Sequence, residues 1–279
     1  MKYSSSNPPL VCMQTQSTCY KETQKMAIKG ILWHSTGANN PNLKRYIQPS
    51  EKKPKEDSYS KEEWLKLLGK NQYKNDWNHI YREAGVNCWI GKLADGKVTT
   101  IQTLPWDFKP WGCGNGAKGS CNDGWIQFEI CEDSLKDKEY FSKIYTEACE
   151  ITAYLCKLYN INPNSTVLHN GIKVPTVLCH QDSYKLGLGS NHKDIYHWFA
   201  KYGKDMTNVR ADVKKLLTDA EKENTTVKKL YRVRKDKNDS KSQIGAFSSL
   251  SNAKSACKKA GAGYKVFDWN WKVVYLNKN

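Results

Sequence analysis

Short apolar runs of strand length recur through the first 180 residues. They occupy residues 26–34, 86–91, 98–102, 125–131 and 175–179. Apolar runs of this length, bounded by turn formers, indicate buried strands, and the Ala94-Asp95-Gly96 turn joins two of them as a hairpin. Residues 138–160 instead repeat apolar positions with helical spacing. Because strands and helices intermix, we predict an α/β (α+β) fold with a mixed central β-sheet flanked by helices.

The last fifty residues have the pattern of a separate small unit. Strands are expected at 231–234, 243–247, 264–267 and 272–275, with a helix over 250–260. The charged segment before them has helical character, and we interpret it as a solvated linker. We therefore expect a main domain over 1–207, a helical linker over 208–228 and a small α+β module over 229–279. A unit this small, basic and aromatic is more typical of binding than of catalysis.

Histidines end two of the predicted strands. His34 closes the first run and His180 follows the run at 175–179, with Asp194 in a later loop. Two histidines at the mouths of buried strands plus an acid from a loop would make a zinc site with three protein ligands and one open position, which is the catalytic arrangement. A histidine at a strand end is more often a simple hydrogen-bonding residue. No compact H-E-x-x-H or C-x-x-C pattern is present, so spacing alone leaves both interpretations open.

An acid interrupts the strand predicted at residues 125–131. Glu129 lies between Phe128 and Ile130, where a carboxylate is costly to bury without a partner. The strand follows a Gly-rich loop over 103–124, and loops this long inside compact domains are usually functional. Glu129 is therefore either a site residue or half of a structural salt bridge.

Net charge is +16 with a pI near 9.3, which predicts an anionic partner. Nucleic acid, anionic lipid and an anionic cell wall all qualify. The sequence contains no helix-turn-helix or RNP-type pattern, so we expect no nucleic-acid partner. No apolar stretch approaches the roughly 18 residues of a membrane span, so we expect no membrane insertion. The N-terminus lacks the apolar region of a signal peptide, which predicts a protein kept in the cytoplasm until it is released.

Ten cysteines are spread through the chain without a zinc-ribbon pattern. In the absence of a secretion signal we expect most to be reduced and buried as small hydrophobic residues. Cys113 and Cys121 flank a Gly-rich loop and could pair under oxidising conditions.

Residues 26–203 resemble a known enzyme family. The segments that carry the likeness are ILWHSTG, WIGKLADGKVTTIQTLPW, WGCGNGAKGSCNDGWIQFEI and LCHQDSYKLGLGSNHKDIYHWF. They resemble the zinc-dependent type 2 N-acetylmuramoyl-L-alanine amidases, a group that includes phage lysozymes and peptidoglycan-recognition proteins. The likeness is greatest to endolysins and autolysins of clostridial cells and their phages. The C-terminal tail is similar to the small wall-binding modules of those enzymes and, more weakly, to SPOR-like modules.

The resemblance assigns roles residue by residue. His34 and His180 correspond to the first two zinc ligands, and Asp194 fits the third best. The family's Pro-Gly after the third ligand is missing here and the loop is longer, which leaves His192 as a rival ligand. Members of the family often have a lysine two residues before the third ligand. If Asp194 is that ligand, His192 stands at this position and would face the substrate carbonyl. Glu129 corresponds to the catalytic glutamate.

The function implied by the resemblance is peptidoglycan hydrolysis during bacterial cell lysis. The enzyme would use Zn²⁺ to cleave the amide between the lactyl group of N-acetylmuramic acid and L-alanine. Its partners would be peptidoglycan and the associated anionic wall polymers, and we expect a monomer. The alternative is a recognition protein that binds peptidoglycan without cutting it. Such relatives lack a zinc ligand, whereas this chain offers a candidate for every position.

Overall fold

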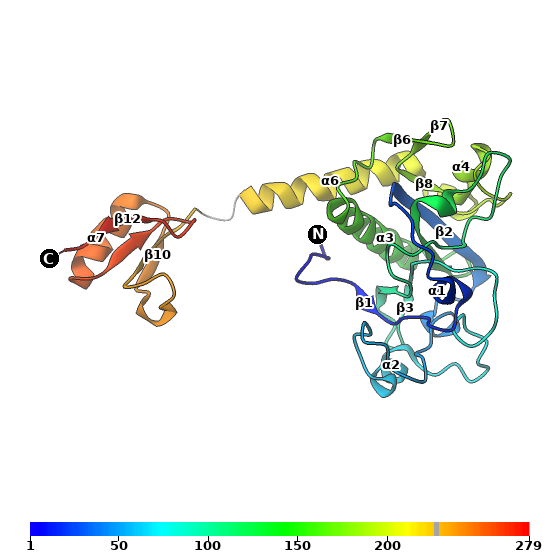
Figure 1. Cartoon of the computed structure of the whole chain (residues 1–279), viewed down its shortest axis with the longest axis horizontal. Coiled ribbons are helices and arrows are strands. Elements are labelled where there is room, and N and C mark those ends of the chain that lie inside the picture. Colours follow the sequence, from blue (N-terminus) through cyan, green and yellow to red (C-terminus); the bar gives the residue numbers. More distant parts are fainter. Residues whose placement is uncertain (226–228, 279) are drawn as a thin grey trace. The chain divides into compact units, whose positions relative to one another are not determined.

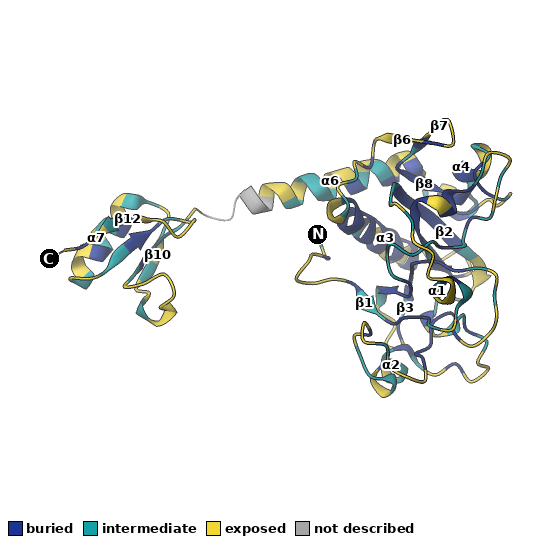
Figure 2. Cartoon of the chain, in the orientation of Figure 1, coloured by how far each residue is buried: buried dark blue, intermediate teal, exposed yellow. Residues whose placement is uncertain are grey.

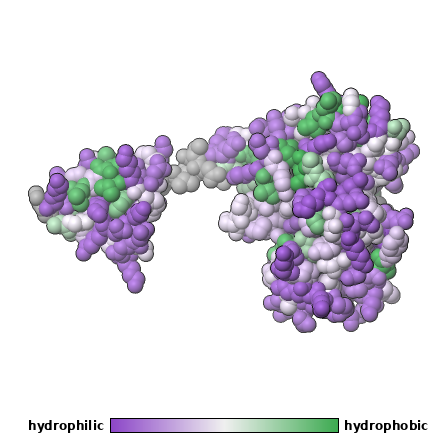
Figure 3. All heavy atoms as spheres, viewed as in Figure 1, coloured by the Kyte–Doolittle hydropathy of each residue, from purple (hydrophilic) through white to green (hydrophobic). Residues whose placement is uncertain are grey.

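The structure is a computed structural model that describes residues 1–225 and 229–278. The chain divides into two compact units, Met1–Leu217 and Thr218–Asn279. None of the helices within the described residues is long and apolar enough to cross a membrane. In Figure 3, hydrophilic residues cover most of the visible face of each unit.

A six-stranded mixed sheet forms the centre of the first unit. Its strands lie in the order β1 (Leu10–Val11), β4 (Val98–Gln102), β3 (Cys88–Lys92), β5 (Trp125–Glu132), β2 (Gly30–Asn39) and β8 (Val177–Cys179). Neighbouring strands are parallel except for the β3–β4 hairpin. The expected mixed α/β fold is confirmed.

Alternating side chains give the sheet two different faces. Ile31, Trp33 and Phe128 point to one face, where α3 (Lys138–Leu158) packs against β2, β3 and β4 (Figure 1). Figure 2 shows buried residues along the large sheet and along α3. Leu32 and Leu178 belong to a second cluster on the opposite face. His34 and Glu129 share the parity of Leu32, so they point away from α3.

The helix after the first unit's sheet is not the free linker expected over 208–228. It spans α6 (Met206–Thr225), and its first turns belong to the main core. Val209 and Val213 are fully buried there, because apolar residues four apart line one side of a helix. The boundary between the two units falls at Leu217, inside this helix. Residues 226–228 of the expected linker lie outside the described residues.

Shorter elements surround the sheet. They are α1 (Thr18–Glu22), η1 (Leu43–Arg45), α2 (Lys61–Leu68), η2 (Cys121–Asp123), β6 (Thr166–His169), β7 (Ile172–Pro175), α4 (His180–Lys185), α5 (Tyr196–Phe199) and η3 (Ala200–Tyr202). All ten cysteines are buried free thiols, as expected, and Cys113 and Cys121 are not paired. The N-terminal segment is anchored by Tyr3, whose hydroxyl donates to Glu147 of α3.

The second unit is a four-stranded antiparallel sheet with one helix. The sheet has the order β10 (Gly245–Phe247), β9 (Tyr231–Arg234), β11 (Lys265–Phe267) and β12 (Val273–Leu276), with η4 (Ser240–Ser242) between β9 and β10. Its core consists of Val233 and Val266 from the sheet and Ala253 and Cys257 from α7 (Leu250–Ala260).

Candidate metal and catalytic site

Three predicted site residues meet at one edge of the large sheet. β2 and β8 are parallel neighbours with Trp33 opposite Cys179, so the next residues, His34 and His180, leave the two strands side by side. Asp194 comes from the loop before α5, and its carbonyl accepts a hydrogen bond of 3.1 Å from the Gln181 N–H in α4. The strand order therefore brings together residues separated by up to 160 positions.

The ligand atoms of this group converge. The two histidine Nδ1 atoms are 3.0 Å apart. The carboxylate of Asp194 lies 3.2 Å from Nδ1 of His34 and 3.5 Å from Nδ1 of His180. One ligand atom from each residue lies within 4.8 Å of the others, and the described residues contain one such group of three or more. All three side chains are buried.

The charge states suit a cation. Burial by itself raises the pKa of Asp194, but the adjacent His180 and His34 rings bring that pKa well below its ordinary value. Burial lowers the pKa of His180. At neutral pH the site thus offers an ionised carboxylate and an unprotonated imidazole, which are the forms that bind metals.

Glu129 lies beside this group without a partner. It is directly opposite His34 in the parallel β2–β5 pair. The residue is half-buried, yet its Oε2 atom is buried and has no hydrogen-bond partner within the described part of the chain. Burial, followed by the nearby Asp194 and Glu132 carboxylates, raises the pKa of Glu129 well above its ordinary value. Such a carboxyl group is suited to proton transfer.

His192 lies next to the group and is not a member of it. Its ring centroid is 4.6 Å from that of His180, and its Nδ1 atom is 3.0 Å from Oγ of Ser190. The side chain is exposed, in contrast to Asp194. Of the two rivals for the third position, Asp194 is the one that lies with the two histidines. The remaining histidine of the segment, His197, instead bonds Glu132 at 2.9 Å.

Two polar residues that the sequence analysis did not single out bond the histidines. The Oε1 atom of Gln127 lies 2.8 Å from Nε2 of His34. The Oγ atom of Ser190 lies 3.2 Å from Nε2 of His180. The sequence did contain a signal for Gln127. This residue comes two positions before Glu129 in the same apolar strand, so the two side chains point to the same face. No local pattern distinguishes Ser190 from other loop serines.

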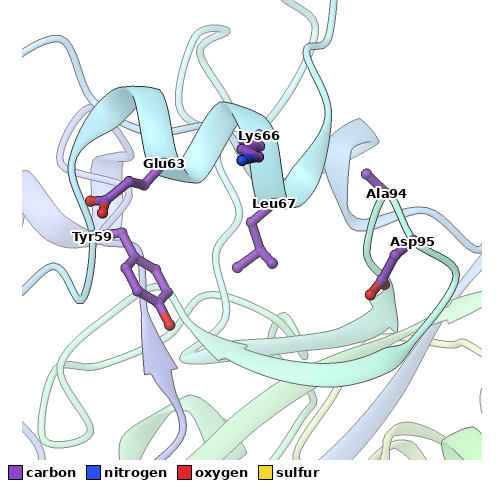
Figure 4. Close-up of a pocket in the computed structure, with 6 residues that line it drawn as sticks. All are labelled: Tyr59, Glu63, Lys66, Leu67, Ala94 and Asp95. Atoms are coloured by element: carbon purple, nitrogen blue, oxygen red, sulfur yellow. The ribbon is translucent and has the colours of Figure 1, made fainter.

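A cavity of about 520 Å³ lies elsewhere, between α2 and the β3–β4 turn. Tyr59, Leu67 and Ala94 line it together with Glu63, Lys66 and Asp95 (Figure 4). None of the residues of the histidine group contributes to it.

Metal-binding side chains beside a carboxyl that can carry a proton are typical of hydrolases that activate water. Residues 24–194 match the N-acetylmuramoyl-L-alanine amidase family of type 2, and the chain belongs to this family. The protein is therefore a peptidoglycan hydrolase with N-acetylmuramoyl-L-alanine amidase activity. No curated protein matches the sequence.

Three of the solved structures that this chain is similar to are AmiA, PlyL and the PlyG catalytic domain. The hydrolase AmiA of Staphylococcus aureus, in complex with its ligand, is 19% identical with a TM-score of 0.47, over 77% of this chain and 86% of that one. PlyL is 18% identical with a TM-score of 0.41, over 73% and 93% of the two chains. The PlyG catalytic domain is 18% identical with a TM-score of 0.42, over 74% and 93%.

Proposed function

We propose that this amidase depends on zinc held by His34, His180 and Asp194. The donor set supports the proposal, because two imidazole nitrogens and one carboxylate oxygen are ligands that Zn²⁺ favours. Three protein ligands leave one position open, as catalytic zinc sites require. When bound, the ion would supply Lewis acidity and would lower the pKa of water from 15.7 toward about 7.

Glu129 is the proton carrier in this proposal. Its unpartnered Oε2 accepts the proton of the attacking water and returns it to the leaving amine, which is the α-amino group of the L-alanine that begins the released stem peptide. A nearby cation favours the ionised carboxylate before attack, and the buried environment favours release of that proton only to a strong acceptor such as the amine. His192, exposed beside His180, faces the substrate carbonyl and stabilises the oxyanion as it develops.

The observation that carries the proposal is the convergence of three metal-binding atoms beside a partnerless carboxyl. The test is mass spectrometry of purified peptidoglycan after digestion, with protein as purified, after treatment with a chelator, and after zinc is restored. We expect peptides that begin with L-alanine and intact glycan strands, lost on chelation and regained with zinc. Cleavage that survives complete removal of metal would overturn zinc dependence while leaving the amidase activity itself standing.

We also propose that the second unit binds the cell wall, as the resemblance to clostridial and SPOR-like modules implies. Residues 229–279 contain twelve Lys and Arg against three Asp. Because Val233 faces α7, Arg232 and Arg234 point to the open face of the sheet. Their guanidinium groups lie 5.2 and 4.7 Å from the ring of Trp271, which is partly exposed. Cations beside an accessible aromatic ring suit anionic wall polymers that contain sugars.

Co-sedimentation with purified cell walls tests this binding. A chain that ends after residue 222 should remain in the supernatant, and the full chain should pellet with the walls in low salt. Arg232→Ala with Arg234→Ala should weaken pelleting, while Lys241→Ala on η4 serves as a control for the loss of one positive charge. Displacement by DNA more readily than by soluble wall fragments would contradict a wall ligand.

The remaining proposals concern the cell. We propose a monomeric endolysin or autolysin of clostridial type that stays in the cytoplasm until it is released and then lyses cells. Fractionation of producing cells before and after lysis, together with light scattering of the purified protein, would test location and oligomeric state. A stable dimer, or enzyme at the wall before lysis begins, would count against this description.

A further inference from the structure

We infer that Gln127 and Ser190 are positioning residues, which fix the tautomers of His34 and His180 so that both Nδ1 atoms face the metal position. The inference rests on the proposed zinc dependence and adds residues that act through the ligands. Its basis is the direction of each hydrogen bond behind the two rings. A neutral imidazole carries one proton, so the nitrogen that donates behind the ring determines which nitrogen can bind in front.

The direction can be traced from the backbone to His34. The Cys113 N–H donates to Oδ1 of Asn122 at 3.1 Å, which identifies that atom as the acceptor end of the amide. Nε2 of Gln127 lies 2.8 Å from the same Oδ1 and must donate to it. The Oε1 atom of Gln127 therefore faces His34 and can only accept, so the proton of His34 is on Nε2. The lone pair on Nδ1 then faces Asp194 and His180.

Gly112 leaves the space that this bond needs. A Cβ atom at position 112 would lie 2.2 Å from Oε1 of Gln127 and 3.1 Å from Nε2 of His34. Any side chain there would displace one member of the pair. Gly112 thus has a structural reason in this chain.

Ser190 has the same role behind His180. Its Oγ lies 3.2 Å from the carbonyl oxygen of Cys113, which can only accept, so the hydroxyl proton points there. The oxygen is then left to accept from Nε2–H of His180 at 3.2 Å and from Nδ1–H of His192 at 3.0 Å. His180 thus also keeps its proton on Nε2 and presents Nδ1 to the site. Nε2 of His192 takes no part in these bonds, so a protonated His192 ring keeps one N–H for the substrate.

The two bonds make the site selective for a cation. They leave Nδ1 of His34 and Nδ1 of His180 as acceptors 3.0 Å apart, each within 3.5 Å of a carboxylate oxygen. Acceptors packed this closely repel one another unless a positive charge lies among them. Without Gln127 or Ser190, either ring could move its proton to Nδ1 and satisfy the carboxylate by itself. The tautomer would then compete with the metal.

The experiment measures zinc affinity by chelator competition in the full-length protein. Gln127→Met keeps the volume and removes the acceptor, and we expect zinc affinity to fall about 10–100-fold. Ser190→Ala should lower zinc affinity by a comparable factor, because Ser190 bonds the ring of His180. Gln102→Met is the matched control, because Gln102 is also buried and, among the described residues, its side chain bonds the Leu104 carbonyl alone. Its zinc affinity should equal that of the wild type.

A second measurement reads the tautomers directly. Long-range ¹H–¹⁵N NMR spectra of zinc-free protein labelled with ¹⁵N-histidine should show Nε2–H tautomers for His34 and His180 in the wild type. Gln127→Met should shift His34 alone toward Nδ1–H, and Ser190→Ala should shift His180. If Gln127→Met does not fold, as judged by circular dichroism, Ser190→Ala in its partly exposed loop decides the matter.

The outcomes separate this inference from the proposed function. Wild-type protein that fails to bind zinc would overturn the zinc proposal and this inference with it. Wild-type affinity and unchanged tautomers in both variants, with normal zinc binding throughout, would overturn only the roles of Gln127 and Ser190.

Discussion

At the scale of single residues, the site combines groups that folding alone does not favour. A buried carboxylate oxygen without a partner typically costs 1–3 kcal/mol, and Glu129 carries one. Retaining an unpaired acid beside His34 is therefore explained by proton transfer better than by stability.

Glu129→Gln tests that explanation. The amide keeps the shape of the side chain but cannot carry a proton, so we expect amide hydrolysis to fall by at least 10²–10⁴-fold. Bound zinc should stay at the wild-type level, because Glu129 is not one of the three converging ligands. The measurements are peptide release from purified peptidoglycan and metal content of the protein. Activity within tenfold of the wild type would remove Glu129 from this role.

Asp194 and His192 should differ when each is changed to alanine. Asp194→Ala removes one of the three converging atoms and should abolish stoichiometric zinc. His192→Ala should retain zinc and lose activity, because its ring lies beside the ligands without joining them. Elemental analysis of both purified variants distinguishes them. The opposite pattern would exchange their roles.

Asp57 predicts a dependence of stability on pH away from the site. Burial raises its pKa to about 6, although the Met13 N–H donates to it at 2.7 Å. A raised folded-state pKa gives stability that is full below the unfolded value near 3.9 and is lost as pH rises through about 6. Asp57→Asn keeps an acceptor for Met13 and cannot ionise.

We therefore expect the free energy of unfolding of Asp57→Asn to rise relative to that of the wild type between pH 4 and pH 7. The expected difference is on the order of 1 kcal/mol once solvent screening is allowed for. Urea unfolding of both proteins at several pH values measures the difference. Stability curves that stay parallel across this interval would contradict the prediction.

At the scale of elements, the order of the strands in the large sheet brings most of the site residues together. The sequence predicts β2, β3, β4, β5 and α3 well, because their apolar periodicity is strong and local. It predicts the ligands through the family pattern. It does not reveal that β2 lies between β5 and β8, since these pairings join His34 to Glu129, 95 positions away, and Trp33 to Cys179, 146 positions away.

The same limit explains what the sequence analysis missed. The hydrogen bond between Gln127 and His34 spans 93 positions, and the bond between Ser190 and the Cys113 carbonyl spans 77. Both residues lie in segments that resemble the family, but the family pattern assigns neither of them a role. The prediction of a solvated linker over 208–228 was wrong for a related reason. Charged residues dominate the composition of α6, but two valines on one side of this helix pack into the core.

Substitution of Gly30 tests how far the site depends on the packing of β2 against its neighbours. A Cβ atom there would lie 2.1 Å from the Thr176 carbonyl oxygen and 2.4 Å from the Trp125 indole nitrogen. Gly30→Ala should force β2 away from its neighbours and destabilise the fold by about 1–3 kcal/mol. Zinc affinity should fall too, since β2 carries His34.

Gly171→Ala is the comparison for that variant. Gly171 has φ of +79° with open space around it, so alanine there adds backbone strain without a clash. Thermal unfolding should show a loss of stability, with zinc affinity unchanged. Equal zinc affinity in both variants would mean that the site tolerates movement of β2.

At the scale of the whole molecule, the boundary inside α6 determines where the chain can be divided. A chain that ends at residue 207 loses Val209 and Val213, each worth about 1.5–3 kcal/mol when buried. A chain that ends after residue 222 keeps both. We expect the longer chain to match the first unit's thermal stability in the full protein and the shorter chain to unfold at a lower temperature. Equal melting temperatures would contradict the packing of α6 on the core.

The buried thiols also make each unit report on its own unfolding. Nine lie between Cys12 and Cys179 in the first unit, and Cys257 alone belongs to the second. Buried thiols resist alkylation until the surrounding structure opens. A brief pulse of alkylating reagent at increasing urea, read by peptide mass, would therefore record two denaturation curves from one unlabelled protein. Alkylation of Cys257 would thus report the unfolding of the second unit without the need for a bound ligand.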